Sequence, residues 1–238
     1  MVNLPFSLSQ KDVWTELLAW SNSCHLNIGG YTRIQGRLDQ SLYRLALGQM
    51  TKANSVLRMV PYPDGHQTLL DDYEHPLIYQ DFSSSNRAYE EAIEWQQDWM
   101  KEPFELGNKP PIRFALLKIN DELHIFVMQS LHILMDGWSL SVAVQKLGQH
   151  YTAIMTADDA HIEISRDYQH YIDESGKYKS TKVFEKDLAF WQDNLQHLPE
   201  PVFDTRYRIS NPGGIAKGHI ETCAVARNLI DDLKALVS

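Results

Sequence analysis

The stretch at residues 129–139, which reads QSLHILMDGWS, contains the residues of this chain best suited to chemistry. His132, Asp136 and Gly137 give it the pattern H-x-x-x-D-G. Histidine changes its protonation state near neutral pH and often acts as a general acid or base, so the stretch predicts a proton-transfer site at His132. Two plainer interpretations stay open. A histidine after a strand is often structural, and an aspartate before a helix often caps it.

The flanking residues predict a strand before His132 and a helix after Asp136. Residues 122–130 are rich in strand formers, which indicates a mostly buried strand. Asp136 is predicted to be buried, and it and Ser139 are the candidate helix caps. Gly137 suits a close backbone approach or a positive φ. The helix face is predicted from apolar residues at spacings of four and three: Leu140, Val144, Leu147, Tyr151 and Ile154.

Helices and strands interleave along the rest of the chain. Ser7 and Gln10 have the spacing of a capping box, which predicts a helix through about Trp20. Gly29 and Gly30, inside a strand-like run at 26–35, predict a bulge or a close backbone approach. This order predicts an α/β sandwich with a mixed sheet. The other predicted elements are a helix capped by Asp39 that carries Leu42, Leu45, Ala46 and Met50, a hairpin of residues 56–60 and 67–70, helices at 87–101 and 184–195, and strands at 111–119 and 219–227.

The stretch around His132 resembles the H-H-x-x-x-D-G motif of condensation domains in nonribosomal peptide synthetases. These domains belong to the chloramphenicol acetyltransferase-like superfamily. His132 matches the second, catalytic histidine of the motif, whereas Leu131 stands where the family has its first histidine. The glycine and tryptophan that follow Asp136 argue against the related epimerization domains, which usually lack the glycine.

Three further stretches extend this resemblance in the family's order. Residues 8–14 (LSQKDVW) resemble its opening S-x-A-Q-x-x-x-W helix, and residues 54–58 (NSVLR) resemble its H-E-x-L-R segment. Asp167 and Tyr168, before a predicted long helix that ends at Phe190 and Trp191, resemble its Y-x-D-Y/F segment. Residues 27–31 (NIGGY) and 198–201 (LPEP) are similar to the starter-type subgroup, whose members commonly acylate the first amino acid of a peptide.

The resemblance implies a condensation reaction, in which an acyl group passes from one thioester to the amine of another and an amide forms. His132 is then expected to position or deprotonate the amine, and the Gly137 N–H to stabilise the oxyanion. Asp136 is expected to be structural and ion-paired, with Arg58 or Arg113 as substitutes for the family's usual arginine. The remaining site residues that the resemblance implies are Leu131 and Arg58 as structural support and Trp138, Ser139 and Tyr31 along the substrate tunnel.

The resemblance also implies partners but no directly bound cofactor and no metal. The family's substrates arrive as phosphopantetheine thioesters on donor and acceptor peptidyl carrier proteins, and the domain adjoins an adenylation domain. Full condensation domains have two similar lobes, and this chain has about the length of one. We therefore predict an N-terminal lobe at residues 1–200, followed at 201–238 by a linker and the start of a truncated C-terminal lobe. An isolated lobe exposes apolar surface, which predicts self-association.

The composition argues against several other classes of protein. The net charge of the 238 residues is −9 and no basic stripe is visible, which argues against nucleic-acid binding. Cys24 and Cys223 lie far apart without disulfide or metal-ligand spacing, so a reducing cytoplasm is expected. The sequence has neither an apolar run of about 18 residues nor a basic signal-peptide start, and no membrane association is expected.

Two functions from different classes stay open at this point. One is an acyl-transferring enzyme, which His132, Asp136 and Gly137 favour. The other is a non-catalytic lobe that binds carrier proteins or acts as a scaffold, which Leu131 and the short chain favour. An acyltransferase that uses a soluble coenzyme thioester is a third and weaker alternative.

Overall fold

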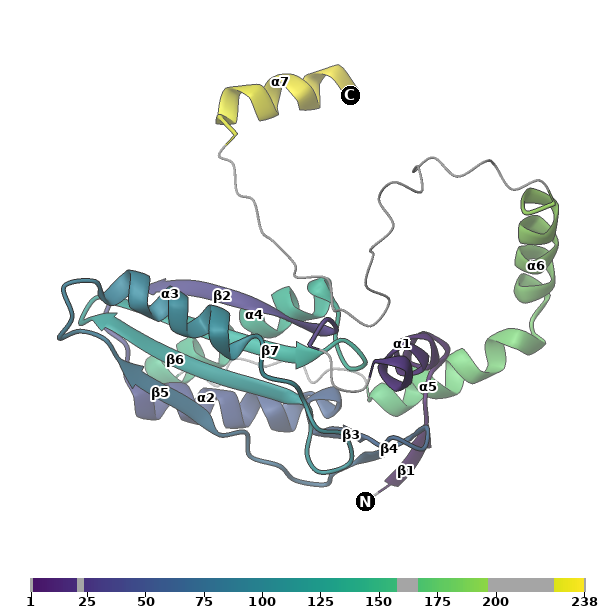
Figure 1. Cartoon of the computed structure of the whole chain (residues 1–238), viewed down its shortest axis with the longest axis horizontal. Helices are drawn as coiled ribbons and strands as arrows, with labels where there is room; N and C mark the ends of the chain where they lie inside the picture. The colour runs from purple at the N-terminus through teal and green to yellow at the C-terminus, as the bar shows by residue number, and fades with distance from the viewer. Residues whose placement is uncertain (1, 21–23, 158–166, 197–224, 238) are drawn as a thin grey trace. The chain divides into compact units, whose positions relative to one another are not determined.

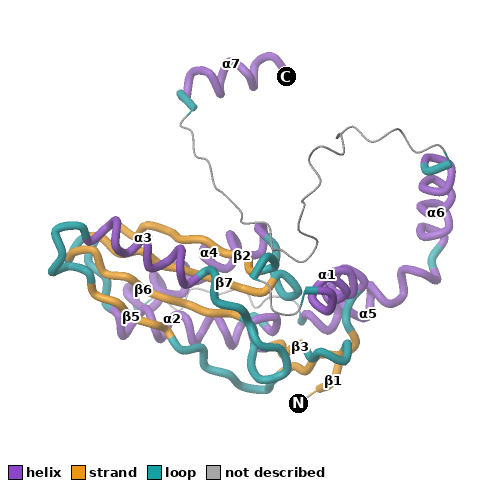
Figure 2. Tube along the Cα trace, in the orientation of Figure 1, coloured by secondary structure: helices purple, strands orange, loops and turns teal. Residues whose placement is uncertain are grey.

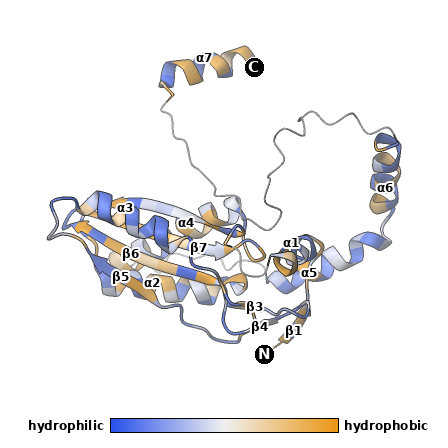
Figure 3. Cartoon of the chain, viewed as in Figure 1, coloured by the Kyte–Doolittle hydropathy of each residue, from blue (hydrophilic) through white to orange (hydrophobic). Residues whose placement is uncertain are grey.

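The computed structural model describes residues 2–20, 24–157, 167–196 and 225–237. The chain divides into two compact units, Met1–Leu198 and Pro199–Ser238. In the second unit, helix α7 (Arg227–Val237) has hydrophobic and hydrophilic residues on different sides (Figure 3). Residues 201–224, which include the beginning of the predicted linker and most of the strand predicted at 219–227, lie outside the described residues. Arg227 begins a helix instead.

A four-stranded sheet with the order β2-β7-β6-β5 forms the centre of the first unit (Figures 1 and 2). Strand β5 runs parallel to β6, and the other neighbouring strands are antiparallel. The predicted α/β fold with a mixed sheet is therefore confirmed, although the sequence patterns did not predict β5. The strands are β2 (Asn27–Gln35), β5 (Leu77–Asp81), β6 (Ile112–Asn120) and β7 (Leu123–Leu131).

Helices cover both faces of this sheet. One hydrophobic cluster lies between the sheet and helices α2 (Gln40–Ala53) and α4 (Gly137–Thr156), and a second lies between the sheet and α3 (Ala88–Trp99). Because both faces are buried, each of these strands has an unbroken apolar run, Phe114–Leu117 in β6 and Ile125–Met128 in β7. Strand residues of the first cluster include Phe114, Leu116, Phe126 and Met128, and those of the second include Ala115, Leu117, Ile125 and Val127.

The buried faces of the helices agree with the predicted spacing in α4 and only in part in α2. In α4, Leu147 is buried and the other four predicted residues pack against the first cluster, so this face is confirmed. In α2, Ala46 and Met50 are buried as predicted. The prediction that Leu45 belongs to the buried face is wrong, because Leu45 is 51% exposed while Tyr43 and Leu47 are buried. The buried face of α2 instead follows Tyr43, Leu47 and Met50, which are four and three residues apart.

A three-stranded sheet with the order β1-β4-β3 lies beside helix α1 (Leu8–Ala19) in the first unit. Its strands are β1 (Val2–Pro5), β3 (Met59–Pro61) and β4 (His66–Leu69). The β3–β4 hairpin is confirmed, but residues Ser55–Arg58 form a 3-10 helix, η1, in place of the predicted strand start. The capping box before α1 is also confirmed, because Ser7 Oγ accepts from the Gln10 amide and Gln10 Oε1 from the Ser7 amide.

The segment after Asp167 forms two helices and not the single long helix predicted. Helix α5 (Tyr168–Lys177) leads into a 3-10 turn, η2 (Tyr178–Ser180), and then into α6 (Lys182–Asn194). Thr181 has an extended backbone, and its hydroxyl accepts a hydrogen bond from the Phe184 amide as the N-cap of α6. Among the described residues, no helix is both long enough and apolar enough to cross a membrane.

Gly29 confirms the predicted close backbone approach in β2. A Cβ atom on Gly29 would lie 2.3 Å from the Met128 carbonyl oxygen of β7, whereas a Cβ on Gly30 would meet nothing within 4 Å. We therefore expect Gly29→Ala to lower the free energy of unfolding by about 1–3 kcal/mol, because the two strands must separate locally. Gly30→Ala is the matched control and should change it by less than about 0.5 kcal/mol. Urea unfolding measures both, and equal effects would contradict the assigned close approach.

Candidate active site

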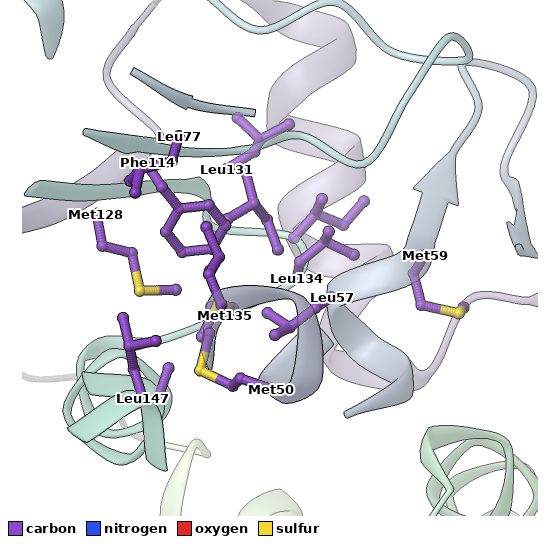
Figure 4. Close-up of a cluster of buried hydrophobic side chains, with 14 of the residues drawn as sticks. Met50, Leu57, Met59, Leu77, Phe114, Met128, Leu131, Leu134, Met135 and Leu147 are labelled. Atoms are coloured by element: carbon purple, nitrogen blue, oxygen red, sulfur yellow. The ribbon is translucent and has the colours of Figure 1, made fainter. Parts of the chain in front are cut away.

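The segment that carries the H-x-x-x-D-G pattern connects β7 to α4 and is called here the histidine loop, residues 131–136. Leu131, Leu134 and Met135 point into the first hydrophobic cluster (Figure 4), and Ile133 is buried as well. His132 is exposed between these buried neighbours. The apolar residues of the motif therefore anchor the loop and leave the imidazole at the surface.

The backbone and the ring of His132 are each fixed by one hydrogen bond. Its amide donates to the Leu26 carbonyl oxygen over 2.9 Å, at the start of β2. Ring Nδ1 lies 3.0 Å from the Met135 carbonyl oxygen. Because a carbonyl oxygen only accepts, the ring proton is assigned to Nδ1, which leaves Nε2 as the atom able to accept a proton. This tautomer is the one that a general base at Nε2 requires.

Asp136 is the N-cap of α4 and is exposed, which corrects the prediction of a buried acid. Its Oδ1 accepts from the Ser139 hydroxyl over 2.6 Å and from the Ser139 amide over 2.7 Å. These two bonds hold the pKa of the Asp136 carboxyl below its ordinary value, and the bond from the Ser139 hydroxyl has the larger effect. Among the described residues, these bonds from Ser139 and not an arginine hold the carboxylate in place.

This geometry predicts how Asp136 variants behave. Asp136→Ala should lower the free energy of unfolding by about 1 kcal/mol, because the amide of Ser139 loses its acceptor. Asp136→Asn should cost only a few tenths of a kcal/mol, because asparagine is an equally good N-cap. Urea unfolding compares the two variants. A loss for Asp136→Asn as large as that for Asp136→Ala would show that the negative charge, and hence an ion pair, matters more than the cap.

Gly137 and Trp138 begin α4 next to the histidine loop. Gly137 was predicted to allow a close backbone approach or a positive φ. Both predictions are wrong within this chain, because a Cβ on Gly137 would meet nothing within 4 Å and its φ is not positive. As the first residue of α4, Gly137 presents an amide without an intrahelical acceptor at the positive end of the helix. Trp138 is 80% exposed. Both residues are therefore accessible to a ligand.

Three cavities surround the start of α4 and contain most of the predicted site residues. The first, about 370 Å³, is lined by His132, Asp136 and Ser139 together with residues of α1 and α5. The second, also about 370 Å³, lies towards α2 and includes Trp138 and Ser139. The third, about 480 Å³, lies along β2 and includes Gly137 and Tyr31. The first two share Met135, Ser139 and Tyr168, so they adjoin one another.

Tyr31 contributes to its cavity less directly than predicted. It is opposite Val127 in the β2–β7 register, and Val127 belongs to the cluster under α3. A hydrogen bond with Tyr89 of α3 is the main cause that raises the pKa of the Tyr31 hydroxyl. The hydroxyl is therefore engaged with α3, and a tunnel role would fall to the backbone of Tyr31.

The arginines expected beside Asp136 lie elsewhere, which corrects the assignment of Arg58 to the histidine loop. Arg58 Nη1 donates to the backbone carbonyls of Leu70 and Asp71 and so connects η1 to the end of β4. Arg113 donates to Glu102 over 2.8 Å. Both guanidinium groups thus stabilise other segments.

Sequence patterns alone did not single out Gln10, Tyr168 and Tyr171 as residues of the first cavity. The two tyrosines are three residues apart at the start of α5, which places them on one side of the helix. That spacing was visible in the sequence, but the contact of α5 with α1 was not. Among the residues that the structure describes, no group of three or more His, Cys, Asp or Glu side chains is arranged to bind a metal ion.

Comparison with known proteins identifies the family. The family model named Condensation domain matches residues 2–237. This chain belongs to the condensation domain family. The condensation domain is 24% identical over 212 residues to isonitrile lipopeptide synthase of Streptomyces coeruleorubidus, covering 87% of this chain and 14% of that protein. It is 25% identical over 207 residues to dimodular nonribosomal peptide synthase of Bacillus subtilis (strain 168), covering 84% of this chain and 9% of that protein.

Solved condensation domains share the fold of this chain. The starter condensation domain of rhizomide synthetase matches with a TM-score of 0.75 at 20% identity, covering 84% of this chain and 49% of the solved one. The first condensation domain of the calcium-dependent antibiotic synthetase, solved with a substrate analogue, matches with a TM-score of 0.76 at 21% identity, covering 85% and 49%. The chloramphenicol acetyltransferase-like fold is therefore confirmed. The chain spans about half the length of these solved domains.

Proposed function

We propose that this chain is the histidine-bearing part of a condensation domain that forms an amide in nonribosomal peptide synthesis. The observation that carries the proposal is the arrangement of His132 at the edge of the first cavity, with Nδ1 donating to Met135 and Nε2 left as the base. The family match and the peptide synthases among the relatives support it.

In the proposed reaction, the amine of an acceptor aminoacyl thioester attacks the carbonyl carbon of a donor acyl thioester. A C–N bond forms, the C–S bond breaks, and the donor leaves as a thiol. His132 Nε2 positions the amine and takes its proton, which then passes to the leaving sulfur. General-base catalysis contributes about 10²–10⁴-fold. Orientation of the two reactants contributes about 7–11 kcal/mol.

The start of α4 supplies the other proposed contacts. The Gly137 amide, at the positive end of the helix, donates to the oxyanion that develops on the thioester carbonyl. Trp138 and Ser139 line the path of the substrate beside it. Asp136 keeps α4 in place as its cap. These roles need no metal and no directly bound cofactor.

The proposed partners follow from the family. Donor and acceptor carrier proteins deliver the substrates on phosphopantetheine arms, and an adenylation domain loads the acceptor. Residues 1–200 are proposed as the N-terminal lobe and 201–238 as the linker and start of the second. The likeness to the rhizomide starter domain supports, at the level of fold, a starter-type reaction that acylates the first amino acid. The cytoplasm remains the location predicted from the sequence.

A second candidate is a non-catalytic lobe that binds carrier proteins or self-associates. The observation that favours it is the apolar surface of α6 and its C-cap: Phe190 and Trp191 of α6 are each 58% exposed, and Leu195, the C-cap, is 54% exposed. Exposed apolar patches of this kind mark interaction sites.

An assay with loaded carrier proteins separates the two candidates. We expect condensation product when this chain is joined to the second half of a condensation domain, and little or none from the chain alone. Product from the chain alone would mean that one lobe, or a dimer of it, builds a complete site. Carrier binding without product in the joined protein would favour the non-catalytic alternative.

A further inference from the structure

A buried pair of amide side chains lies directly behind the histidine loop. Gln10 of α1 is 2% exposed and Gln67 of β4 is fully buried. Their amides face each other and exchange two hydrogen bonds of 2.8 Å, Gln10 Nε2 to Gln67 Oε1 and Gln67 Nε2 to Gln10 Oε1. Burying an amide side chain costs free energy unless its polar atoms are hydrogen-bonded. Two amides buried together at this place therefore call for a role beyond filling space.

The remaining bonds of the pair connect four segments of the first unit. Gln10 Nε2 donates its second hydrogen to the Ile133 carbonyl oxygen over 3.1 Å. Gln67 Nε2 donates its second hydrogen to the Pro5 carbonyl oxygen over 3.0 Å, and Gln10 Oε1 accepts from the Ser7 amide over 3.0 Å. All four amide hydrogens are thereby used. The pair joins β1, the cap of α1, β4 and the histidine loop.

The helix cap alone does not explain a glutamine at position 10. A capping box needs only the side-chain oxygen at this position, which glutamate supplies equally well. A glutamate carboxylate could not donate to Gln67 or to Ile133. The NH₂ group of Gln10 takes no part in the cap. It donates to Gln67 and to the carbonyl oxygen of Ile133, the residue after His132.

We propose that Gln10, paired with Gln67, is a positioning residue that sets the orientation of His132. Two hydrogen bonds of His132 hold the histidine loop. The amide of His132 donates to the Leu26 carbonyl oxygen, and its ring Nδ1 donates to the Met135 carbonyl oxygen. The Gln10 bond fixes the peptide group of Ile133, which lies between these two points. Without that bond, the peptide group of Ile133 keeps the hydrogen bond of the Leu134 amide to the Leu131 carbonyl oxygen, 3.0 Å long. Its carbonyl side is no longer fixed, so the loop can tilt and the Met135 carbonyl no longer stays in line with the ring.

The test replaces both amides by apolar side chains of similar shape, Gln10→Met together with Gln67→Met, because removing both members of a buried polar pair costs less than removing one. Gln96→Met is the matched control, since Gln96 is also buried but lies on α3. Nitrogen-15 NMR of the whole chain measures the share of His132 that carries its proton on Nδ1. We expect this share to fall in the double variant and to stay unchanged in the control.

Unchanged His132 ring signals in a folded double variant would overturn the proposal. Should the double variant fail to fold, Gln10→Glu decides in the same way, because glutamate keeps the oxygen of the cap while a carboxylate cannot donate to Ile133. A fall in the Nδ1–H share of this variant supports the proposal, and unchanged ring signals overturn it.

A second readout uses catalysis and rests on the proposed function. In the chain joined to a second lobe, we expect kcat to fall by about 10- to 100-fold in the double variant, because a small misplacement of a catalytic group has effects of this size. KM should stay within about twofold, since the amide hydrogens of both side chains are used by protein acceptors and are not available to the substrate. If the unaltered protein makes no product, the proposed function fails, while the NMR result still decides the role of Gln10.

Discussion

Replacement of His132 by alanine is expected to lower the condensation rate by about 10²–10⁴-fold in the chain joined to a second lobe. The variant loses the Nε2 atom that accepts the amine proton, while the buried neighbours Leu131, Leu134 and Met135 still anchor the loop. Because the His132 side chain is exposed, its removal should leave the free energy of unfolding almost unchanged. Initial rates with loaded carriers, followed by mass spectrometry, give the comparison.

His170→Ala is the matched control for this experiment. His170 is also exposed and lies on α5, where it pairs with Glu174 over 3.1 Å. It is not among the residues that line the first cavity. A condensation rate that is the same for His132→Ala and for the unaltered protein would remove His132 from the mechanism. An equal loss in both variants would point to a general effect on the protein.

Stability at mildly acidic pH is expected to depend on His75, a histidine in the core. Its side chain is 2% exposed, Nε2 donates to the Leu57 carbonyl oxygen over 2.7 Å, and the ring packs edge-on against Phe114. Burial lowers the pKa of His75 from 6.5 to about 4. The folded protein therefore keeps this imidazole neutral at a pH where the unfolded chain protonates it.

The direction of the effect follows from proton binding. Above pH 6.5 the imidazole is neutral in both states and contributes no pH dependence. Between pH 6.5 and about 4 the unfolded chain binds more protons, so the stability falls as the pH falls. Across the whole window the loss is about 3 kcal/mol.

Urea unfolding between pH 7.5 and 4 measures this contribution. We expect His75→Leu to have a flatter pH profile than the unaltered protein, whatever its stability at neutral pH. His170→Leu should keep the steep profile, because that ring is exposed. Parallel profiles for His75→Leu and the unaltered protein would mean that the buried ring takes up its proton without unfolding.

Elements with local signals could be predicted from the sequence. The start of α1 could be predicted from Ser7 and Gln10, and the start of α2 from Asp39. The cap hydrogen bonds of these residues reach at most three residues along the chain, so they are visible in the local sequence. The strand before His132 was predicted from its run of strand formers, and the helix after it from the regular period of its apolar face. The unusual approach at Gly29 was predicted because glycine is rare within strands without a reason.

Features that depend on contacts between distant segments could not be predicted. Strand β5 is five residues long and is stabilised by its parallel pairing with β6, and β1 by its pairing with β4. Arg58 was expected to substitute for the family's usual arginine beside Asp136, but its acceptors are the carbonyls of Leu70 and Asp71. The Gln10–Gln67 pair joins residues 57 positions apart, which no local pattern indicates.

Transfer of the acyl group between two carriers tests the central claim most directly. The chain, joined to the second lobe of a condensation domain, is mixed with an acyl-loaded donor carrier and an aminoacyl-loaded acceptor carrier, and the mass of the acceptor is followed in a single turnover. We predict that the acceptor gains the mass of the acyl group while the donor returns to its free thiol, and that His132→Ala slows this gain. An acceptor whose mass does not change, on a joined protein that is folded and binds both carriers, would contradict the proposed function.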